Sequence, residues 1–404
     1  MTARFFGTGD QLDAFLIAFL LPSFLSDVVA GSLTPCLIPL LVKSPAPRRM
    51  AGGALATSLG TMSLGALALA VFGRWLLPFA ASSFSTQKLQ LAESLLLGLL
   101  AWLPLSACIA TWRAVLNASG RFALPAAATM GSPAATIALL YLAADRWGVT
   151  VLCAGTIGGV ALECVLLGIS VRRLGYPIVP RWREWQSSGM KQLGRQFAPL
   201  AASAVILSGC TLVDQSVAGR LGSGQISALS YGTKFAGVLL TIAGTSLGTA
   251  VLPAFSRMAA AQDWVEMRRK LWSYCGAIAA ISVPLTLVLI AGSGWLIRTA
   301  FQHGTFQESA TQLVTQIQRY ALLQAPFAMV LAVLTRLTAA LSVNAILLPM
   351  GMMALAADIV FDLLFSHWFG VAGIALATPV VQAVSLAALL SLLRRRSPGL
   401  FTAQ

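Results

Sequence analysis

Eleven apolar stretches, each long enough to cross a lipid bilayer, run through this chain of 404 residues. A spanning helix needs roughly 20 apolar residues. Hydrophobic residues make up 57% of the chain and charged residues 10%, which excludes a water-soluble globular domain of this size. The stretches are continuous rather than alternating, so the sequence predicts an all-α polytopic membrane protein and not a barrel. The predicted spans are 10–42, 51–79, 90–116, 123–144, 148–171, 196–219, 223–255, 271–295, 314–340, 342–366 and 370–392.

Lysine and arginine are distributed unevenly over the predicted connections. Of the 27 basic residues, 19 lie on one side and six on the other, while Lys234 and Arg319 fall within spans. Basic residues collect in cytoplasmic connections, so this asymmetry predicts a cytoplasmic C-terminus and an N-terminus outside. The net charge of +14 is then explained by the orientation of the chain in the membrane. We therefore expect membrane lipids rather than nucleic acid as partners.

The sequence lacks the motifs of common catalytic chemistry. It contains no P-loop pattern and no GxSxG context, and its only two histidines are His303 and His367. Its six cysteines form no CxxC pair, which disfavours a zinc site or a redox dithiol. We therefore expect a protein that is not an enzyme.

Two pairs of landmarks suggest an internal repeat. Gly7-Thr8-Gly9 and Gly222-Ser223-Gly224 open the first and seventh spans, 215 residues apart. Ser32-Leu33 with Pro39, and Ser246-Leu247 with Pro253, close them at an offset of 214. A parallel repeat requires an even number of spans in each lobe, so it predicts a twelfth span ahead of Met1. The predicted parts are an N-terminal lobe of five spans (1–175), a cytoplasmic linker (176–195), a C-terminal lobe of six spans (196–396) and a cytoplasmic tail (397–404).

Several segments, in order along nearly the whole chain, resemble the MurJ/MviN lipid II flippases of the multidrug/oligosaccharidyl-lipid/polysaccharide exporter superfamily. They are Phe6-Gly7-Thr8-Gly9, Asp13-Ala14-Phe15, Ala18-Phe19, Leu21-Pro22, Leu116-Asn117, Arg121-Phe122, Pro125, Ser230-Tyr231, Gly248-Thr249, Leu252-Pro253, Phe301-Gln302-His303-Gly304 and Phe306.

The resemblance implies two pseudo-symmetric lobes of six helices around a central hydrophilic cavity. This chain departs from the family pattern at three places. It lacks most of the first family span, where the family carries cationic residues that meet the substrate, and it stops after the twelfth. Ser26-Asp27 stands where the family typically has a pair of arginines.

Charged residues inside spans are costly in lipid and therefore mark candidate functional sites. Lys234 resembles the family position that bears a cavity arginine, and an ammonium there is suited to a pyrophosphate; the alternative is a lysine paired with Asp13 or Asp27. Asp13 is either a cavity residue or a group stabilised by the helix dipole. With Asp27 and Arg319, these residues form the predicted substrate-binding set.

Acidic residues of the last spans suggest a second site. Asp358 and Asp362 are four residues apart, on one helix face, and two such carboxylates repel unless a proton or a cation lies between them. With Asp214 and Thr378 they resemble residues of family members proposed to bind sodium, so Na⁺ is the predicted coupling ion. The alternatives are a protonated relay pair, or an Asp362 that reaches the outer interface near His367.

The predicted function is translocation of an undecaprenyl-pyrophosphate-linked glycan, either lipid II or a polysaccharide repeat unit, across the bacterial inner membrane by alternating access. Proteins of cell-wall or polysaccharide synthesis are expected partners. One alternative is a non-transporting or degenerate subunit of an assembly complex of that kind. Another is a multidrug-type exporter of cations.

Overall fold

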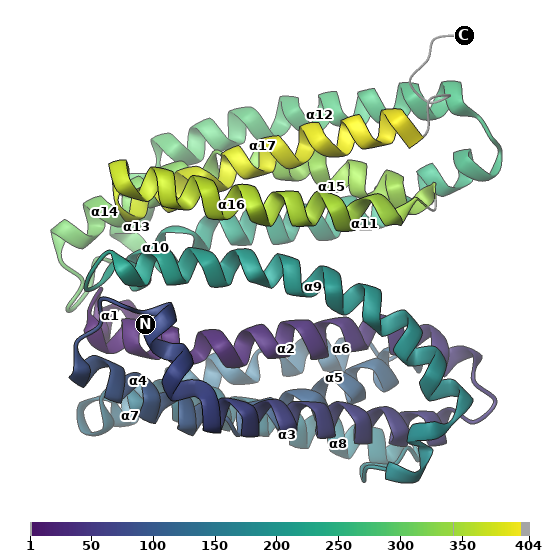
Figure 1. Ribbon diagram of the computed structural model, residues 1–404, viewed down its shortest axis with the longest axis horizontal. Helices are drawn as coiled ribbons and strands as arrows, with labels where there is room; N and C mark the ends of the chain where they lie inside the picture. The colour runs from purple at the N-terminus through teal and green to yellow at the C-terminus, as the bar shows by residue number, and fades with distance from the viewer. Residues whose placement is uncertain (1, 342, 397–404) are drawn as a thin grey trace. The chain divides into compact units, whose positions relative to one another are not determined.

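The computed structural model describes residues 2–341 and 343–396, and every element in these ranges is helical. Eleven of its helical segments are long and apolar enough to cross a membrane, which confirms the predicted fold class and number of spans. The helices are α1 (Thr2–Phe6), α2 (Asp10–Lys43), α3 (Pro47–Ala80), α4 (Thr86–Leu99), α5 (Trp102–Ala118), α6 (Ala123–Ala128), α7 (Gly131–Trp147), α8 (Thr150–Arg173), α9 (Ser188–Arg220), α10 (Gln225–Gly232), α11 (Lys234–Ala260), α12 (Trp264–Ala291), α13 (Ser293–Phe301), α14 (Glu308–Leu322), α15 (Ala325–Ala340), α16 (Leu347–Phe369) and α17 (Val371–Arg396), with short 3₁₀ turns at Trp182–Gln186 and Asn344–Ile346 (Figure 1).

Some positions used in the sequence analysis lie outside the described residues. The predicted tail, 397–404, is one of them. The side chains of Ser246, Gly248, Thr249 and Leu252 in α11 also lie outside them, so these landmarks of the repeat and of the family resemblance stay sequence observations.

The helices divide into two compact units, Met1–Gly224 and Gln225–Gln404. Helix α9 packs against α2 and α3 and belongs to the first unit. The lobes and linker inferred from the repeat, with boundaries at 175 and 195, stay a prediction.

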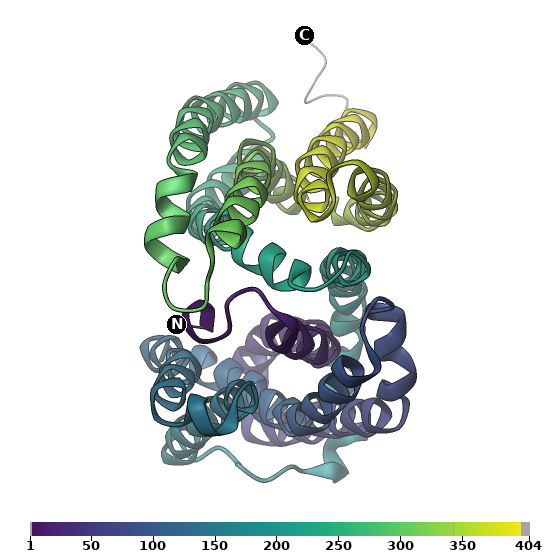
Figure 2. The same cartoon turned by 90° about the vertical axis from the view of Figure 1, so that its left-hand side faces the viewer.

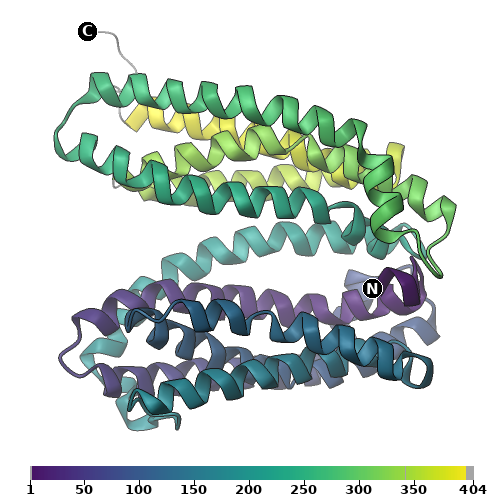
Figure 3. The same cartoon turned by 180° about the vertical axis from the view of Figure 1, so that it is seen from behind.

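In the first unit, α2 is the central helix and contacts α3, α4, α5 and α9 (Figure 1). Helices α7 and α8 form an antiparallel pair. Within this pair it is α8 that packs against α5, as the view from behind shows (Figure 3). Leu37 of α2, Leu116 of α5 and Leu167 of α8 are fully buried where these helices meet. Their burial places an apolar core inside the unit in addition to the apolar surface that faces lipid.

In the second unit, α15 is central and contacts α11, α12 and α17. Val333, Leu334 and Leu337 of α15 pack with Phe255 of α11 and Leu389 of α17 in its core. Helix α16 lies along α17, and the two are seen nearly end on in Figure 2 as the last helices of the chain.

Both units interrupt their third span near its middle. In the first unit the span Thr86–Ala118 is divided between α4 and α5, and in the second the span Glu308–Ala340 is divided between α14 and α15. The same irregularity at the same place in each unit supports the predicted internal repeat. Helix α2 runs unbroken through its three prolines, so the predicted single long span is confirmed.

Glycines allow α7 and α8 to approach each other closely. A Cβ on Gly159 of α8 would lie 2.2 Å from the Cα of Ser132, and one on Gly155 would lie 2.7 Å from the Cα of Thr136. Helix association in lipid depends on van der Waals packing, which small residues at the interface improve. The neighbouring Gly158 faces open space, with nothing within 4 Å of its Cβ position.

A buried charge network joins the first turns of α2 and α4. The Nζ of Lys88 donates to Asp10 Oδ1 at 2.6 Å and to Asp13 Oδ2 at 3.1 Å. The Gly224 amide donates to Asp13 Oδ2 at 2.7 Å, and the Ser223 hydroxyl donates to Asp10 Oδ1 at the same distance. Asp13 is fully buried, and Lys88 is 7% exposed. The network ties α2, α4 and the segment after α9 together within the first unit.

We expect Gly159→Ala to destabilise the protein by about 1–3 kcal/mol, because the added methyl group forces α7 and α8 apart. Gly158→Ala is the matched control and should leave stability unchanged or slightly increased, since alanine favours helix. Thermal unfolding of the purified variants in detergent measures the difference. Equal stability of the two variants would show that the close contact does not hold the pair together.

We also expect Asp13→Asn to destabilise the first unit strongly, by roughly 3–5 kcal/mol, since it leaves the buried Lys88 without its buried counter-charge. Asp10→Asn should cost about 1 kcal/mol or less, because the Asp10 side chain is 62% exposed. Denaturation of both variants under the same conditions tests the ranking. Comparable losses in the two variants would contradict it.

Candidate functional site

The two basic residues that the sequence places within spans, Lys234 and Arg319, both lie in the second unit. Lys234 is the first residue of α11, directly after an interruption at Thr233 that separates α11 from α10. Arg319 lies in the last turn of α14. Both side chains are exposed, and within the described part of their unit neither has a salt-bridge partner. A charge without a partner is costly in lipid, so both side chains are expected to face water.

Lys234 and Arg319 lie at a similar level along two neighbouring helices. Helices α10 and α14 run in the same direction and touch at Gly232, where an added Cβ would lie 2.4 Å from Ile317 Cγ2 (Figure 1). Each cation comes two residues after this contact. At about 1.5 Å per residue, Lys234 lies roughly 14 Å from the start of α10 and Arg319 roughly 17 Å from the start of α14, near the middle of a 30 Å hydrocarbon core.

The two acidic residues predicted for substrate binding in α2 have different surroundings. Asp27 is exposed on α2. A carboxylate that faced lipid at this position would be costly. Asp13 is buried and ion-paired with Lys88. Neither alternative offered for Asp13, a cavity residue or a group stabilised by the helix dipole, includes this ion pair. The roles of both residues in substrate binding stay predictions.

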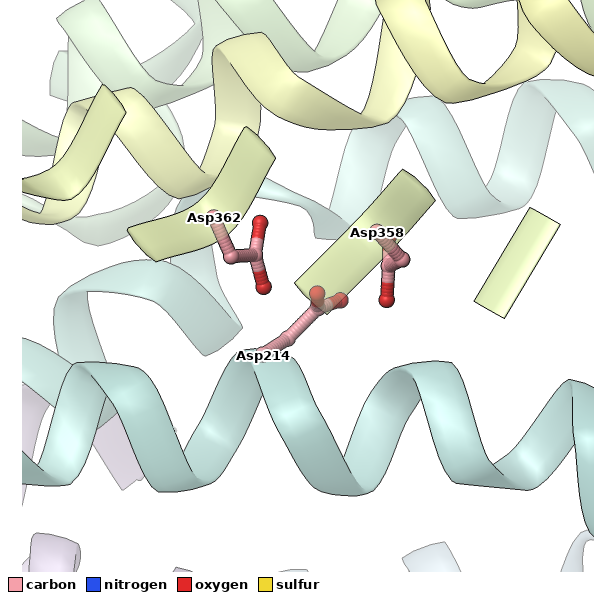
Figure 4. Close-up of side chains that lie close together, drawn as sticks. All are labelled: Asp214, Asp358 and Asp362. Atoms are coloured by element: carbon pink, nitrogen blue, oxygen red, sulfur yellow. The ribbon is translucent and has the colours of Figure 1, made fainter. Parts of the chain in front are cut away.

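Helix α16 carries a polar stripe on its buried face. Its only buried residues in the described structure are Asp358, Asp362 and Ser366, spaced by four, whereas Val360 and Leu363 are among its exposed residues. A soluble helix shows the reverse pattern, with apolar residues buried. Figure 4 shows the two aspartates on α16, together with Asp214 on α9. Because Asp214 belongs to the first unit, its place in the predicted ligand set stays a prediction.

Thr378 lies level with the aspartates of α16. The antiparallel helices α16 and α17 meet at Gly373, where a Cβ would lie 2.1 Å from the backbone oxygen of Phe365. Thr378 comes five residues after Gly373 on α17, and the turn between Asp358 and Asp362 comes about five residues before Phe365 on α16. Because the helices are antiparallel, both lie on the same side of the contact. Carboxylate and hydroxyl oxygens at one level are the ligands that a hard cation prefers, so the chemistry of this part of the second unit fits the predicted Na⁺ site.

Two ion pairs between helices of the first unit were not predicted from the sequence. Lys88 precedes the predicted span 90–116, and in the structure it lies in the first turn of α4, where it pairs with Asp13. In the second pair, Arg113 of α5 donates to Glu163 of α8 through Nε at 2.9 Å and also through a terminal nitrogen. The sequence signal in both cases is that opposite charges stand in, or directly beside, two different spans.

Comparisons with known proteins agree with the fold. A family model described as lipid II flippase MurJ matches residues 2–404. The probable lipid II flippase MurJ of Thermotoga maritima is 26% identical over 387 residues, which cover 94% of this chain and 77% of that protein. The lipid II flippase MurJ of Burkholderia cenocepacia is 26% identical over 330 residues, covering 78% of this chain and 64% of the relative.

Solved structures show the same fold. A lipid II flippase MurJ in an inward-closed conformation matches with a TM-score of 0.83 and 20% identity, covering 97% of this chain and 83% of that one. An inward-facing multidrug transporter of the MATE family matches with a TM-score of 0.79 and 13% identity, covering 100% and 96%. These likenesses concern the fold alone. A flippase moves its substrate without changing a covalent bond, which agrees with the prediction that the chain is not an enzyme. The family model covers nearly the entire chain, and the chain therefore belongs to the lipid II flippase MurJ family.

Proposed function

We propose that this multi-pass membrane protein is a flippase that carries a lipid-linked glycan, lipid II or a closely similar molecule, across the membrane. The observation that carries the proposal is the family match over residues 2–404. The likeness to a multidrug transporter concerns the fold alone, so it gives no support to the alternative of a cation exporter.

The two mid-membrane cations support this substrate class. A pyrophosphate attached to a lipid carries negative charge at the boundary between an apolar tail and a polar glycan. Lys234 supplies a point charge and Arg319 a planar fork of donors for phosphate oxygens. Two exposed cations at one depth provide a place for the pyrophosphate midway through transport, while the lipid tail stays in the bilayer.

The direction of insertion belongs to the same proposal. The excess of basic residues on one side, 19 against six, supports a cytoplasmic C-terminus in the bacterial inner membrane. In this orientation α10 and α14 begin at the outer side, and the glycan leaves toward the start of these helices.

We further propose that the buried polar stripe of α16 binds Na⁺ as the coupling ion. Asp358 and Asp362 are the central ligands, and Thr378 supports them with its hydroxyl. Asp214 enters the proposal from the sequence pattern. Buried carboxylates one helix turn apart favour a bound cation because it offsets their mutual repulsion.

We expect Lys234→Ala to lower translocation of a fluorescent lipid-linked disaccharide in proteoliposomes by about tenfold or more, since it removes a charge-assisted contact to the pyrophosphate. Lys234→Arg should retain most of the activity. Lys191→Ala is the control, because Lys191 is exposed near the start of α9. Full translocation by Lys234→Ala would exclude the central role given to this residue, and absence of translocation by the unaltered chain would favour the non-transporting alternative.

Na⁺ should raise the thermal stability of the purified protein by a few degrees more than K⁺ or choline at equal ionic strength, because a bound ion stabilises the folded state. Asp358→Asn and Asp362→Asn should each abolish this difference. Asp145→Asn, at an exposed position of α7, should leave it intact. An unchanged Na⁺ response in both α16 variants would rule out the site.

A further inference from the structure

Helix α14 has an exposed face that carries two amides and an arginine. Gln312, Gln316 and Arg319 are exposed and lie on one side of the helix, at positions i, i+4 and i+7. The opposite side is buried. Its residues are Ala310, Thr311, Val314, Thr315, Ile317, Gln318, Ala321 and Leu322.

Two other spans of the second unit expose apolar residues. Helix α12 exposes Leu287 and Val288, and α16 exposes Val360 and Leu363. These faces suit lipid, where an uncompensated amide or guanidinium is costly. We therefore expect the polar face of α14 to border water inside the protein and not the bilayer.

The polar groups of this face are ordered along the helix axis. Arg319 lies near the middle of the membrane, Gln316 lies about 4.5 Å closer to the start of α14, and Gln312 about 10.5 Å closer. The Gln316 Nε2 contacts the hydroxyl of Tyr320 at 3.5 Å, so this amide is adjoined by an aromatic ring. Toward the start of α14, Arg319 is thus followed by Gln316 and then by Gln312.

We propose that Gln312 and Gln316 form an amide ladder that binds the sugars next to the pyrophosphate of the lipid-linked substrate. An amide both donates and accepts hydrogen bonds, which suits sugar hydroxyl and acetamido groups but gives little affinity for a phosphate. With the pyrophosphate at Arg319, the first sugars lie level with Gln316 and then Gln312. The inference rests on the proposed function and assigns the recognition of the glycan to α14.

The test compares two lipids that share the lipid tail and the pyrophosphate, lipid II with its glycan and peptide and undecaprenyl pyrophosphate with neither, for binding to the purified full chain in nanodiscs. We expect the double variant Gln312→Ala/Gln316→Ala to bind lipid II about tenfold more weakly, as expected for losing one or two hydrogen bonds. Its affinity for undecaprenyl pyrophosphate should be unchanged, which also shows that the variant is folded.

The chain offers a matched control in Gln192→Ala/Gln196→Ala, two exposed amides with the same spacing in the first turns of α9. This control should bind both lipids as the unaltered protein does. Unchanged lipid II binding in the α14 variant, or an equal loss for both lipids, would overturn the amide ladder. Failure of the unaltered chain to bind either lipid would instead overturn the proposed function.

Discussion

Lipid offers no hydrogen bonds, and this constraint decides where the polar side chains of the spans lie. In the first unit it explains why the buried Asp13 is paired with Lys88 and why Glu163 forms an ion pair with Arg113. Each pair replaces the missing solvent with a counter-charge inside the protein. The same constraint applies to the remaining polar residues. A charged side chain in a span that has no partner within the protein must contact water, an ion or a substrate.

The second unit contains two further kinds of polar residue in its spans. Helix α16 turns its aspartates inward and its apolar residues outward, which fits a cation held between carboxylates. Lys234 and Arg319 remain exposed, and the exposed amides Gln312 and Gln316 lie on the same side of α14 as Arg319. These helices therefore combine a lipid-facing surface with a polar surface suited to a charged, sugar-bearing lipid.

Sequence reasoning predicted the parts of this picture that depend on long patterns. Apolar length gave the number of spans, and the spacing of Asp358 and Asp362 placed them on one helix face. It did not predict the pairing of Lys88 with Asp13, because 75 residues separate them and depth within the membrane is coarse in sequence. It also assigned no role to Gln312 and Gln316, since uncharged amides stand out only when one side of α14 is seen to be buried.

The account depends most on the claim that the polar face of α14 borders water within the membrane. Labelling of single cysteines by a membrane-impermeant maleimide tests it directly, in a background where the six native cysteines are replaced by alanine. We expect Gln316→Cys to react at least about tenfold faster than Leu363→Cys on the apolar face of α16. Equally slow labelling at the two positions would show that lipid or packed protein covers this face, and would contradict the account.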